Sequence, residues 1–290
     1  MPKIGIVVDE GAGLPHDFAQ ANEVEVVRGR VEWPELESLP GENVYQKMRE
    51  AEKRGIKTFV KTAMAVSGDY LNAFRKQLKK FDKILCIVLS AKLSGSYNGA
   101  FQAKNLLSEQ DKERIIIFDT QSGFVGEALF VLKTIDLIKE KRNIEEILEI
   151  LKGLIHRTPF FGIFGDPKWL RASGRINSTQ ANWIRRMKKI NLHPIITLKN
   201  GIIKPGGVVL AKDEIEALFK KVSRTTKSVR AKGGRVRALL SHADSPELAL
   251  RFQNLLEGIN IEVPMILEAP LLVGAHTGPG TFLVAWQELD

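Results

Sequence analysis

A histidine, two threonines and two glycines lie close together in the C-terminal segment 275–281, which reads Ala-His-Thr-Gly-Pro-Gly-Thr. Hydroxyl and backbone N–H groups donate hydrogen bonds, and glycine lets the backbone approach a ligand, so this composition suits a small anion. The segment lies between two apolar runs, residues 264–273 and 282–286. A glycine-proline turn between two strands, with His276 on the surface, explains the same residues equally well.

Three further segments place hydroxyl side chains at or directly after the end of a predicted strand. Ser94-Gly95-Ser96 follows the run 84–89, Thr120-Gln121-Ser122-Gly123 follows 115–118, and Thr62 ends a shorter run. The first two also precede a predicted helix, whose N-terminus offers unpaired N–H groups and a partial positive charge. Each loop by itself is commonly only a helix cap. Together they favour a site for an anion.

The first half of the chain alternates apolar strand-like runs with amphipathic helical segments. Strands are predicted at 3–9, 84–89 and 115–118, and helices at 67–81, 97–107, 124–139 and 144–155, the last capped by Asn143. This alternation predicts a mostly parallel sheet with helices on both faces. The hydroxyl-bearing loops would then share the edge formed by the carboxyl ends of the strands, where such proteins bind ligands.

The second half mixes strands and helices around one clear hairpin. Asn200-Gly201, between residues 194–198 and 202–205, is a strong two-residue hairpin signal. A helix is predicted at 212–222 and a strand at 259–266. The change of pattern predicts two domains, an N-terminal α/β domain over 1–157 and a C-terminal α/β domain over 158–290.

Composition excludes several classes of protein. The 290 residues carry a net charge of +9 and 44% of them are hydrophobic, which is typical of a globular chain. No apolar run approaches the ~20 residues that span a bilayer, and no signal-peptide pattern is present, so a cytoplasmic protein is expected. Cys86 is the single cysteine and the five histidines are scattered, so neither a disulfide nor a zinc site is expected.

Two other function classes remain as alternatives. The chain has no G-x-x-x-x-G-K-[ST] loop and no G-x-S-x-G elbow. A stand-alone hydrolase or phosphotransferase could still use Ser94 and His276, with Asp119 as the third member of a triad. Residues 217–243 contain eight lysines and arginines and no acid, which would suit an interaction module for an acidic partner. No helix-turn-helix or RNA-recognition signature appears, so nucleic-acid binding is not expected.

Four segments resemble motifs of the DegV family and occur in the family order. Residues 89–100, LSAKLSGSYNGA, are similar to LSSxLSGTYxSA, and residues 119–126, DTQSGFVG, to DTxxxSxG. Residues 170–177, LRASGRIN, resemble LxxGGRIS, and residues 274–280, GAHTGPG, resemble the terminal GxHxGPG. The resemblance covers nearly the whole chain, and its first and last motifs are the most specific.

The resemblance implies a two-domain α/β protein that binds one long-chain fatty acid in an apolar tunnel between its domains. It also implies that the bound carboxylate is presented to a separate kinase, which converts it to an acyl phosphate. The chain itself would then be a lipid-binding carrier, the binding subunit of a fatty acid kinase, with no cofactor and no complete active site.

The same resemblance assigns roles to individual residues by position. Thr62 and Ser94 would hydrogen-bond the fatty-acid carboxylate, with His276 and Thr277 beside the same oxygens. Arg175 would face the kinase partner. The backbone of the pocket would be shaped by Gly95, Ser122, Gly123 and Gly278.

Two segments depart from the family pattern. The opening motif VTDSxxxLP has Glu10 in place of its serine. The family's TSQP is here Thr62-Ala63-Met64-Ala65, which keeps only the threonine. Both departures fall next to predicted ligand contacts, so they bear on the head-group geometry rather than on the fold.

Overall fold

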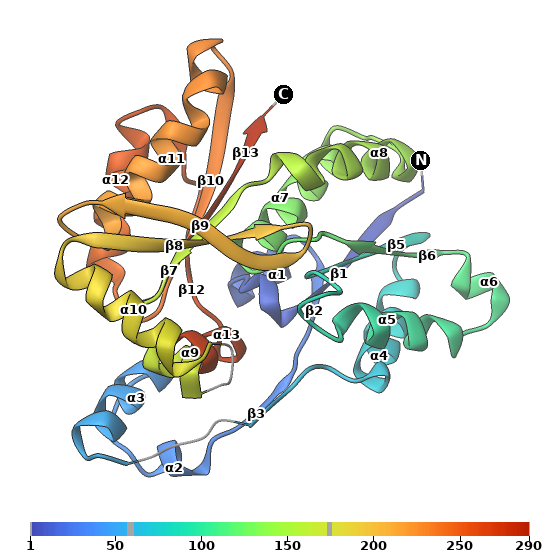
Figure 1. Cartoon of the computed structure of the whole chain (residues 1–290). Coiled ribbons are helices and arrows are strands. Elements are labelled where there is room, and N and C mark those ends of the chain that lie inside the picture. Colours follow the sequence, from blue (N-terminus) through green and yellow to red (C-terminus); the bar gives the residue numbers. More distant parts are fainter. Residues whose placement is uncertain (1, 57–60, 173–175, 290) are drawn as a thin grey trace. The chain divides into compact units, whose positions relative to one another are not determined.

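The computed structural model describes residues 2–56, 61–172 and 176–289. The chain forms two compact units (Figure 1). Unit 1 comprises Met1–Arg30, Ala63–Pro159 and Leu198–Ile202, and unit 2 comprises Val31–Thr62, Phe160–Thr197 and Ile203–Asp290. The polypeptide therefore passes from one unit to the other several times. The predicted domain boundary near residue 158 stays a prediction.

Unit 1 is built on a parallel sheet. Its strands are β1 (Ile4–Asp9), β2 (Val24–Val27), β5 (Lys83–Val88) and β6 (Ile115–Asp119), in the order β2-β1-β5-β6. All three neighbouring pairs run parallel, as predicted. Every residue of β1 is buried, which explains the continuous apolar sequence of residues 4–8.

Helices cover both faces of this sheet (Figure 1). On one face Tyr70 and Phe74 of α4 and Ala100 of α5 pack against Val7 and Cys86, and α7 contacts β1 and β5 from the other. Asn143 caps α8 as predicted, and the structure adds a reciprocal capping box with Glu146. The helices of unit 1 are α1 (His16–Ala21), α4 (Ser67–Leu78), α5 (Ser96–Asn105), α6 (Glu109–Lys112), α7 (Val125–Lys139) and α8 (Ile144–Leu154), with short 3₁₀ turns at Glu10–Ala12 and Ile155–Arg157.

Unit 2 is built on a mixed sheet whose main path runs β11-β10-β13-β7-β8-β9. β13 is antiparallel to both β10 and β7, whereas β11 and β12 pair with β10 in parallel. Asn200 and Gly201 both have positive φ angles, 53° and 75°, which is the geometry of the predicted hairpin turn. The strands are β7 (Phe160–Ile163), β8 (Leu192–Lys199), β9 (Ile202–Leu210), β10 (Arg235–His242), β11 (Ile261–Glu262), β12 (Ile266–Glu268) and β13 (Phe282–Leu289).

Long helices of unit 2 bury an apolar face against this sheet. Leu218 and Val222 of α11 and Phe252 of α12 share one core with Val284 and Trp286 of β13. The helices are α2 (Pro34–Glu37), α3 (Val44–Lys53), α9 (Lys168–Ala172), α10 (Ser178–Lys189), α11 (Glu214–Ala231), α12 (Pro246–Glu257) and α13 (Leu271–Thr277). Two short strands, β3 (Arg30–Glu32) and β4 (Lys61–Ala63), pair with each other.

For two elements of unit 2, the predicted bounds were wrong. The helix predicted to end at residue 222 continues to Ala231, because Thr226 is buried on the same face and donates its hydroxyl to the carbonyl of Val222. The strand predicted over 259–266 is instead two short strands, β11 and β12. Pro264 lies between them and has no N–H group for the ladder, which accounts for the break.

Within the described residues, no helix combines the length and the apolar character that crossing a membrane requires.

Candidate anion-binding site

Two of the predicted ligand contacts meet in unit 2. Thr62 of β4 and His276 of α13 are 214 positions apart in sequence, yet the Thr62 hydroxyl lies 3.1 Å from Nε2 of His276. Both side chains are half-buried, so they are held by the fold and still reach its surface. A threonine hydroxyl can accept one hydrogen bond and donate another, so Thr62 can contact Nε2 of His276 and still donate its proton to a carboxylate.

The segment that carries His276 is a helix and not the predicted turn between two strands. Residues Leu271–Thr277 form α13, which ends at Gly278 with a φ of 77°. Five of the seven residues of α13 are buried, so packing of this short helix outweighs the turn signal of the glycines and proline that follow. The turn follows the helix at residues 279 and 280, and the N–H of Gly280 donates to the carbonyl of Ala243.

Thr277 and Gly278 are neighbours of His276 with different environments. The hydroxyl of Thr277 donates to the carbonyl of Val273, 3.1 Å away, so its proton is directed into the helix. A side chain at Gly278 would overlap the indole ring of Trp169, and its positive φ also favours glycine. The predicted roles of Thr277 and Gly278 stay predictions, and the structure shows what holds each one.

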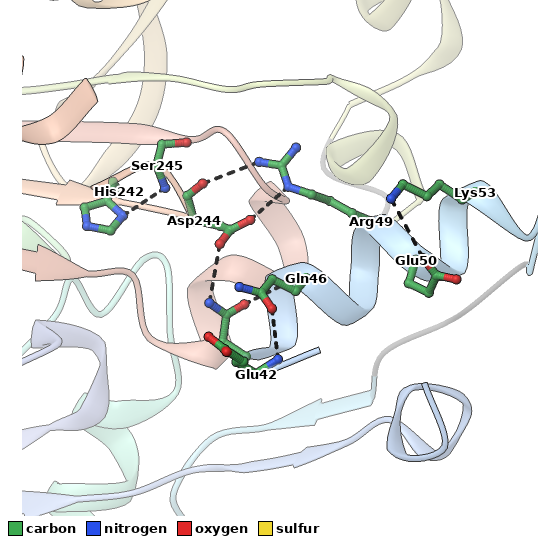
Figure 2. Close-up of polar contacts among 9 residues, drawn as sticks. Glu42, Gln46, Arg49, Glu50, Lys53, His242, Asp244 and Ser245 are labelled. Atoms are coloured by element: carbon green, nitrogen blue, oxygen red, sulfur yellow. Dashed lines mark hydrogen bonds and ion pairs between the residues drawn. The ribbon is translucent and has the colours of Figure 1, made fainter. Parts of the chain in front are cut away.

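α13 is anchored by α3. The Tyr45 hydroxyl donates to the carbonyl of Ala269, and the ring lies directly against Gly274 of α13. Nε of Arg49 donates to Asp244, 2.9 Å away, and the amide of Asn43 reaches the same carboxylate (Figure 2). These contacts tie α3 both to the loop after β10 and to the helix that presents His276.

In unit 1, Ser94 and Ser96 form the second predicted cluster. The Ser94 hydroxyl lies 3.0 Å from that of Ser96 and accepts a hydrogen bond from the Ser96 N–H group. Ser94 is half-buried and Ser96 is fully buried at the start of α5. A Cβ atom on Gly95 would meet nothing within 4 Å, so the space beside this turn is open. Ser94 is therefore the member of the pair that is accessible.

Most polar groups of the loop after β6 form hydrogen bonds that fix the conformation of the loop. Thr120 donates its hydroxyl to the carbonyl of Val88, and the N–H of Ser122 donates to the same hydroxyl. The Ser122 carbonyl accepts from the N–H of Ser90. The Ser122 hydroxyl is buried and has no hydrogen-bond partner among the described residues. Gly123 is buried with Leu89 and Leu198 nearby, and its role as pocket backbone stays a prediction.

Two buried carboxyl groups near this cluster were not predicted as site residues. Asp9, at the end of β1, accepts from the N–H groups of Gly11 and Leu89. Burial raises the pKa of Asp9 to about 6, against the lowering effect of these hydrogen bonds. Burial, followed by the charge of Asp9, raises the pKa of Glu127 well above its usual value. The sequence signal for Glu127 was a single acid within the otherwise apolar stretch 125–132.

Two predicted residues remain, Arg175 and Asp119. Arg175 lies outside the described residues. Asp119, the third member of the alternative triad, accepts from the N–H groups of Ala91 and Gln121. Among the described residues no three His, Cys, Asp or Glu side chains gather as a metal site.

Most cations of the segment 217–243 lie on α11 or on β10. Lys220 forms an ion pair with Glu216, Arg230 contacts Ser223 and Thr226, and Arg237 pairs with Glu262. These contacts within unit 2 account for part of the basic character of the segment.

Comparison with known proteins places the whole chain in one family. A model of the DegV family matches residues 3–289. A DegV domain-containing protein of Clostridium perfringens is 25% identical over 290 residues, covering 98% of each chain. A protein of Thermotoga maritima named fatty acid-binding protein is 26% identical over 294 residues, covering 96% of each.

Solved structures share the fold. A DegV family protein from Thermus thermophilus, described for its fatty acid binding, is 24% identical with a TM-score of 0.79, covering 99% of this chain and all of that one. A stearic acid-binding protein from Eubacterium ventriosum is 19% identical with a TM-score of 0.80, covering 98% and 97%. With its four motifs, its parallel sheet and the family match over nearly every residue, this chain belongs to the DegV family.

Proposed function

We propose that this protein binds one long-chain fatty acid and holds its carboxylate with Thr62 and His276. The observation that carries the proposal is the 3.1 Å contact between these two side chains, which joins residues from distant parts of the sequence at a half-buried position. Structures of the fold are described with stearic, vaccenic and heptadecanoic acids bound. Ser94 and Thr277 are proposed as further carboxylate contacts, on the family resemblance.

The chemistry of a fatty acid agrees with this donor set. A carboxylate needs a few strong donors, and charge-assisted hydrogen bonds are the stronger kind. Burial of an acyl chain of about sixteen carbons would contribute on the order of 10 kcal/mol at ~0.8 kcal/mol per CH₂ group. The entropy lost on association offsets part of that gain. The apolar chain would then supply most of the affinity, and the polar contacts would fix the orientation.

We further propose that the protein is a carrier that presents the carboxylate to a separate kinase for acyl phosphate formation. The support is the motif resemblance, in which Arg175 would face the kinase. The competing hypothesis is catalysis by the isolated chain through Ser94 and His276. Turnover of an ester, or of ATP plus fatty acid, by the isolated protein would favour that alternative.

Thr62→Val is expected to weaken fatty-acid binding about tenfold or more, because it removes one charge-assisted hydrogen bond while keeping the shape of the side chain. The measurement is a fluorescence or calorimetric titration of delipidated protein with oleate. In an assay with a fatty acid kinase, acyl phosphate formation at low oleate should fall in parallel.

Thr179→Val is the matched control, because Thr179 is exposed on α10. This control should bind oleate as the wild type does. If Thr62→Val binds oleate as tightly as the control, the carboxylate is held elsewhere and the proposed role of this residue is wrong.

A further inference from the structure

The end of β10 and the loop that follows it, residues 242–245, contact the chain on both sides of α13. The carbonyl of His242 accepts from the N–H of Ala269, before α13 begins. Ala243 exchanges two backbone hydrogen bonds with residues 280–281, after α13 ends. Both ends of the helix that presents the proposed carboxylate contact are therefore tied to this one loop.

The same loop also holds α3, through Asp244. Nε of Arg49 donates to one oxygen of Asp244, 2.9 Å away, and the amide of Asn43 lies 3.4 Å from the other (Figure 2). α3 in turn packs on α13 through the Tyr45 ring. A displacement of the loop would therefore remove support from α13 before it, after it and through α3.

The loop is closed by a hydrogen bond in which the ring of His242 is the acceptor. The N–H of Ser245 lies 3.2 Å from Nδ1 of His242 (Figure 2). A backbone N–H can only donate, so Nδ1 is unprotonated and the proton of the neutral imidazole is on Nε2. Asp244 lies between the two residues with a φ of 57°, in the left-handed region that favours glycine, so the turn depends on the contacts that hold it.

We infer that His242 is a positioning residue for the fatty-acid site and that it acts only while its imidazole is neutral. A protonated imidazole carries a hydrogen on both nitrogens, so it cannot accept from Ser245, and two N–H groups would face each other. The loop would then open, and α13 would hold His276 less firmly against a carboxylate. This inference rests on the proposed function and adds a pH control to the same site. The proton comes from solvent, and no covalent bond changes.

The surroundings of His242 set the pH range of this effect. Charged side chains on the elements next to it are Asp244 in the loop, Arg49 on α3, Glu247 at the start of α12 and Glu268, aligned with His242, on β12. The aligned residue of β13 is Phe282, which carries no charge. Burial lowers the pKa of His242 below its usual value of 6.5, and the charge of Asp244 raises it by less. The ring is therefore neutral at pH 7.5, and the loss of support is expected as pH falls below 6.5.

The test compares fatty-acid binding by the wild type and by His242→Asn at pH 7.5 and at pH 5. The asparagine amide oxygen can accept from Ser245 as Nδ1 does, but it does not titrate. Calorimetric titrations of the delipidated proteins use dodecanoate, which is shorter and more soluble than oleate. We expect equal affinities at pH 7.5 and about threefold tighter binding by the variant at pH 5, since only the wild type loses the hydrogen bond.

The two proteins are compared at the same pH, so ionisation of the ligand or of His276 affects both alike. If they lose affinity in parallel between pH 7.5 and pH 5, the inference is overturned. A His242→Asn variant that already binds more weakly than the wild type at pH 7.5 would also contradict it.

His242→Phe keeps a ring of similar shape and removes the acceptor at every pH. It is expected to bind dodecanoate about fivefold more weakly than the wild type at pH 7.5. Wild-type affinity in this variant would show that the hydrogen bond to Ser245 does not position the site. If His242→Phe does not fold, the comparison with His242→Asn decides by itself.

His156→Asn is the matched control, because it makes the same substitution at an exposed histidine of unit 1. It should follow the wild type at both pH values. If His156→Asn gains as much affinity at pH 5 as His242→Asn does, loss of a positive charge causes the gain and the loop does not.

The two proposals fail in different ways. If dodecanoate and oleate give no binding heat with the wild type, the proposed function itself is wrong. If both bind and His242→Asn has no advantage at pH 5, fatty-acid binding stands and only the role of His242 falls.

Discussion

The substitution Gly274→Ala is expected to lower the free energy of unfolding by about 3 kcal/mol and to abolish fatty-acid binding. Its Cβ atom would overlap the hydroxyl and ring of Tyr45. Tyr45 cannot move aside easily, because it is 1% exposed, packs with Trp33 and Met48, and donates its hydroxyl to Ala269. The clash would therefore displace α13, the helix that carries His276. Urea denaturation and an oleate titration are the two measurements.

Gly153→Ala is the control for this substitution. Gly153 is also helical, but a Cβ atom there would meet nothing within 4 Å. The usual preference of helices for alanine should then raise stability, by about 0.5 kcal/mol, with binding unchanged. If Gly274→Ala is as stable as the wild type and binds oleate normally, the contact between α3 and α13 does not position the site.

Glu127→Gln is expected to gain stability relative to the wild type as pH rises from 5 to 7.5. The pKa of Glu127 is raised in the folded state by burial and by Asp9, so the folded protein keeps a proton that the unfolded chain releases. The stability from such a group is complete below its unfolded pKa of about 4.5 and is lost as pH rises toward the folded pKa. Glutamine carries no titrating proton, so the variant avoids this loss.

The stability difference between the wild type and Glu127→Gln, measured at pH 5 and at pH 7.5, reports the protonation of Glu127. Asp9 has the same sign, since its pKa rises from 3.8 to about 6, and would cost the folded protein about 1 kcal/mol between pH 5 and pH 7.5. The pKa of His242 is lowered by burial, which gives the opposite slope below pH 6.5. His242 is not among the groups that shift the pKa of Glu127, so its contribution cancels in the difference, whereas Asp9 is coupled to Glu127 and contributes to the measured effect.

Glu145→Gln is the control, because Glu145 is an exposed acid in the first turn of α8, as Glu127 is a buried one in the first turn of α7. Its effect on urea unfolding should be small and nearly independent of pH. A Glu127→Gln difference that is the same at pH 5 and pH 7.5 would show that this carboxyl is not held protonated by burial.

The sequence predicted those parts of the fold that depend on local signals. Residues 4–8 are apolar throughout because β1 is buried on both faces, and Asn143 is the N-cap of α8 as predicted. Asn200-Gly201 takes the two positive φ angles of a hairpin turn. Each of these features is decided by residues within a few positions of each other.

Features that depend on tertiary packing were missed or misjudged. α11 extends past residue 222 because Thr226 is buried, and polar Thr226 gives no such signal in sequence. The first three residues of the turn predicted at 275–281 are helical instead, because α13 packs on Tyr45. The pKa of Glu127 is raised by burial and then by the charge of Asp9, and neither cause can be inferred from residues that lie 118 positions apart in the sequence.

The most direct test of fatty-acid binding is mass spectrometry of an organic extract of the protein purified without delipidation. The proposed function predicts a long-chain fatty acid in a ratio near one per protein chain, absent from the same extract after delipidation and restored by incubation with oleate or palmitate. An extract without fatty acid, from a protein that after delipidation binds neither oleate nor palmitate, would contradict it.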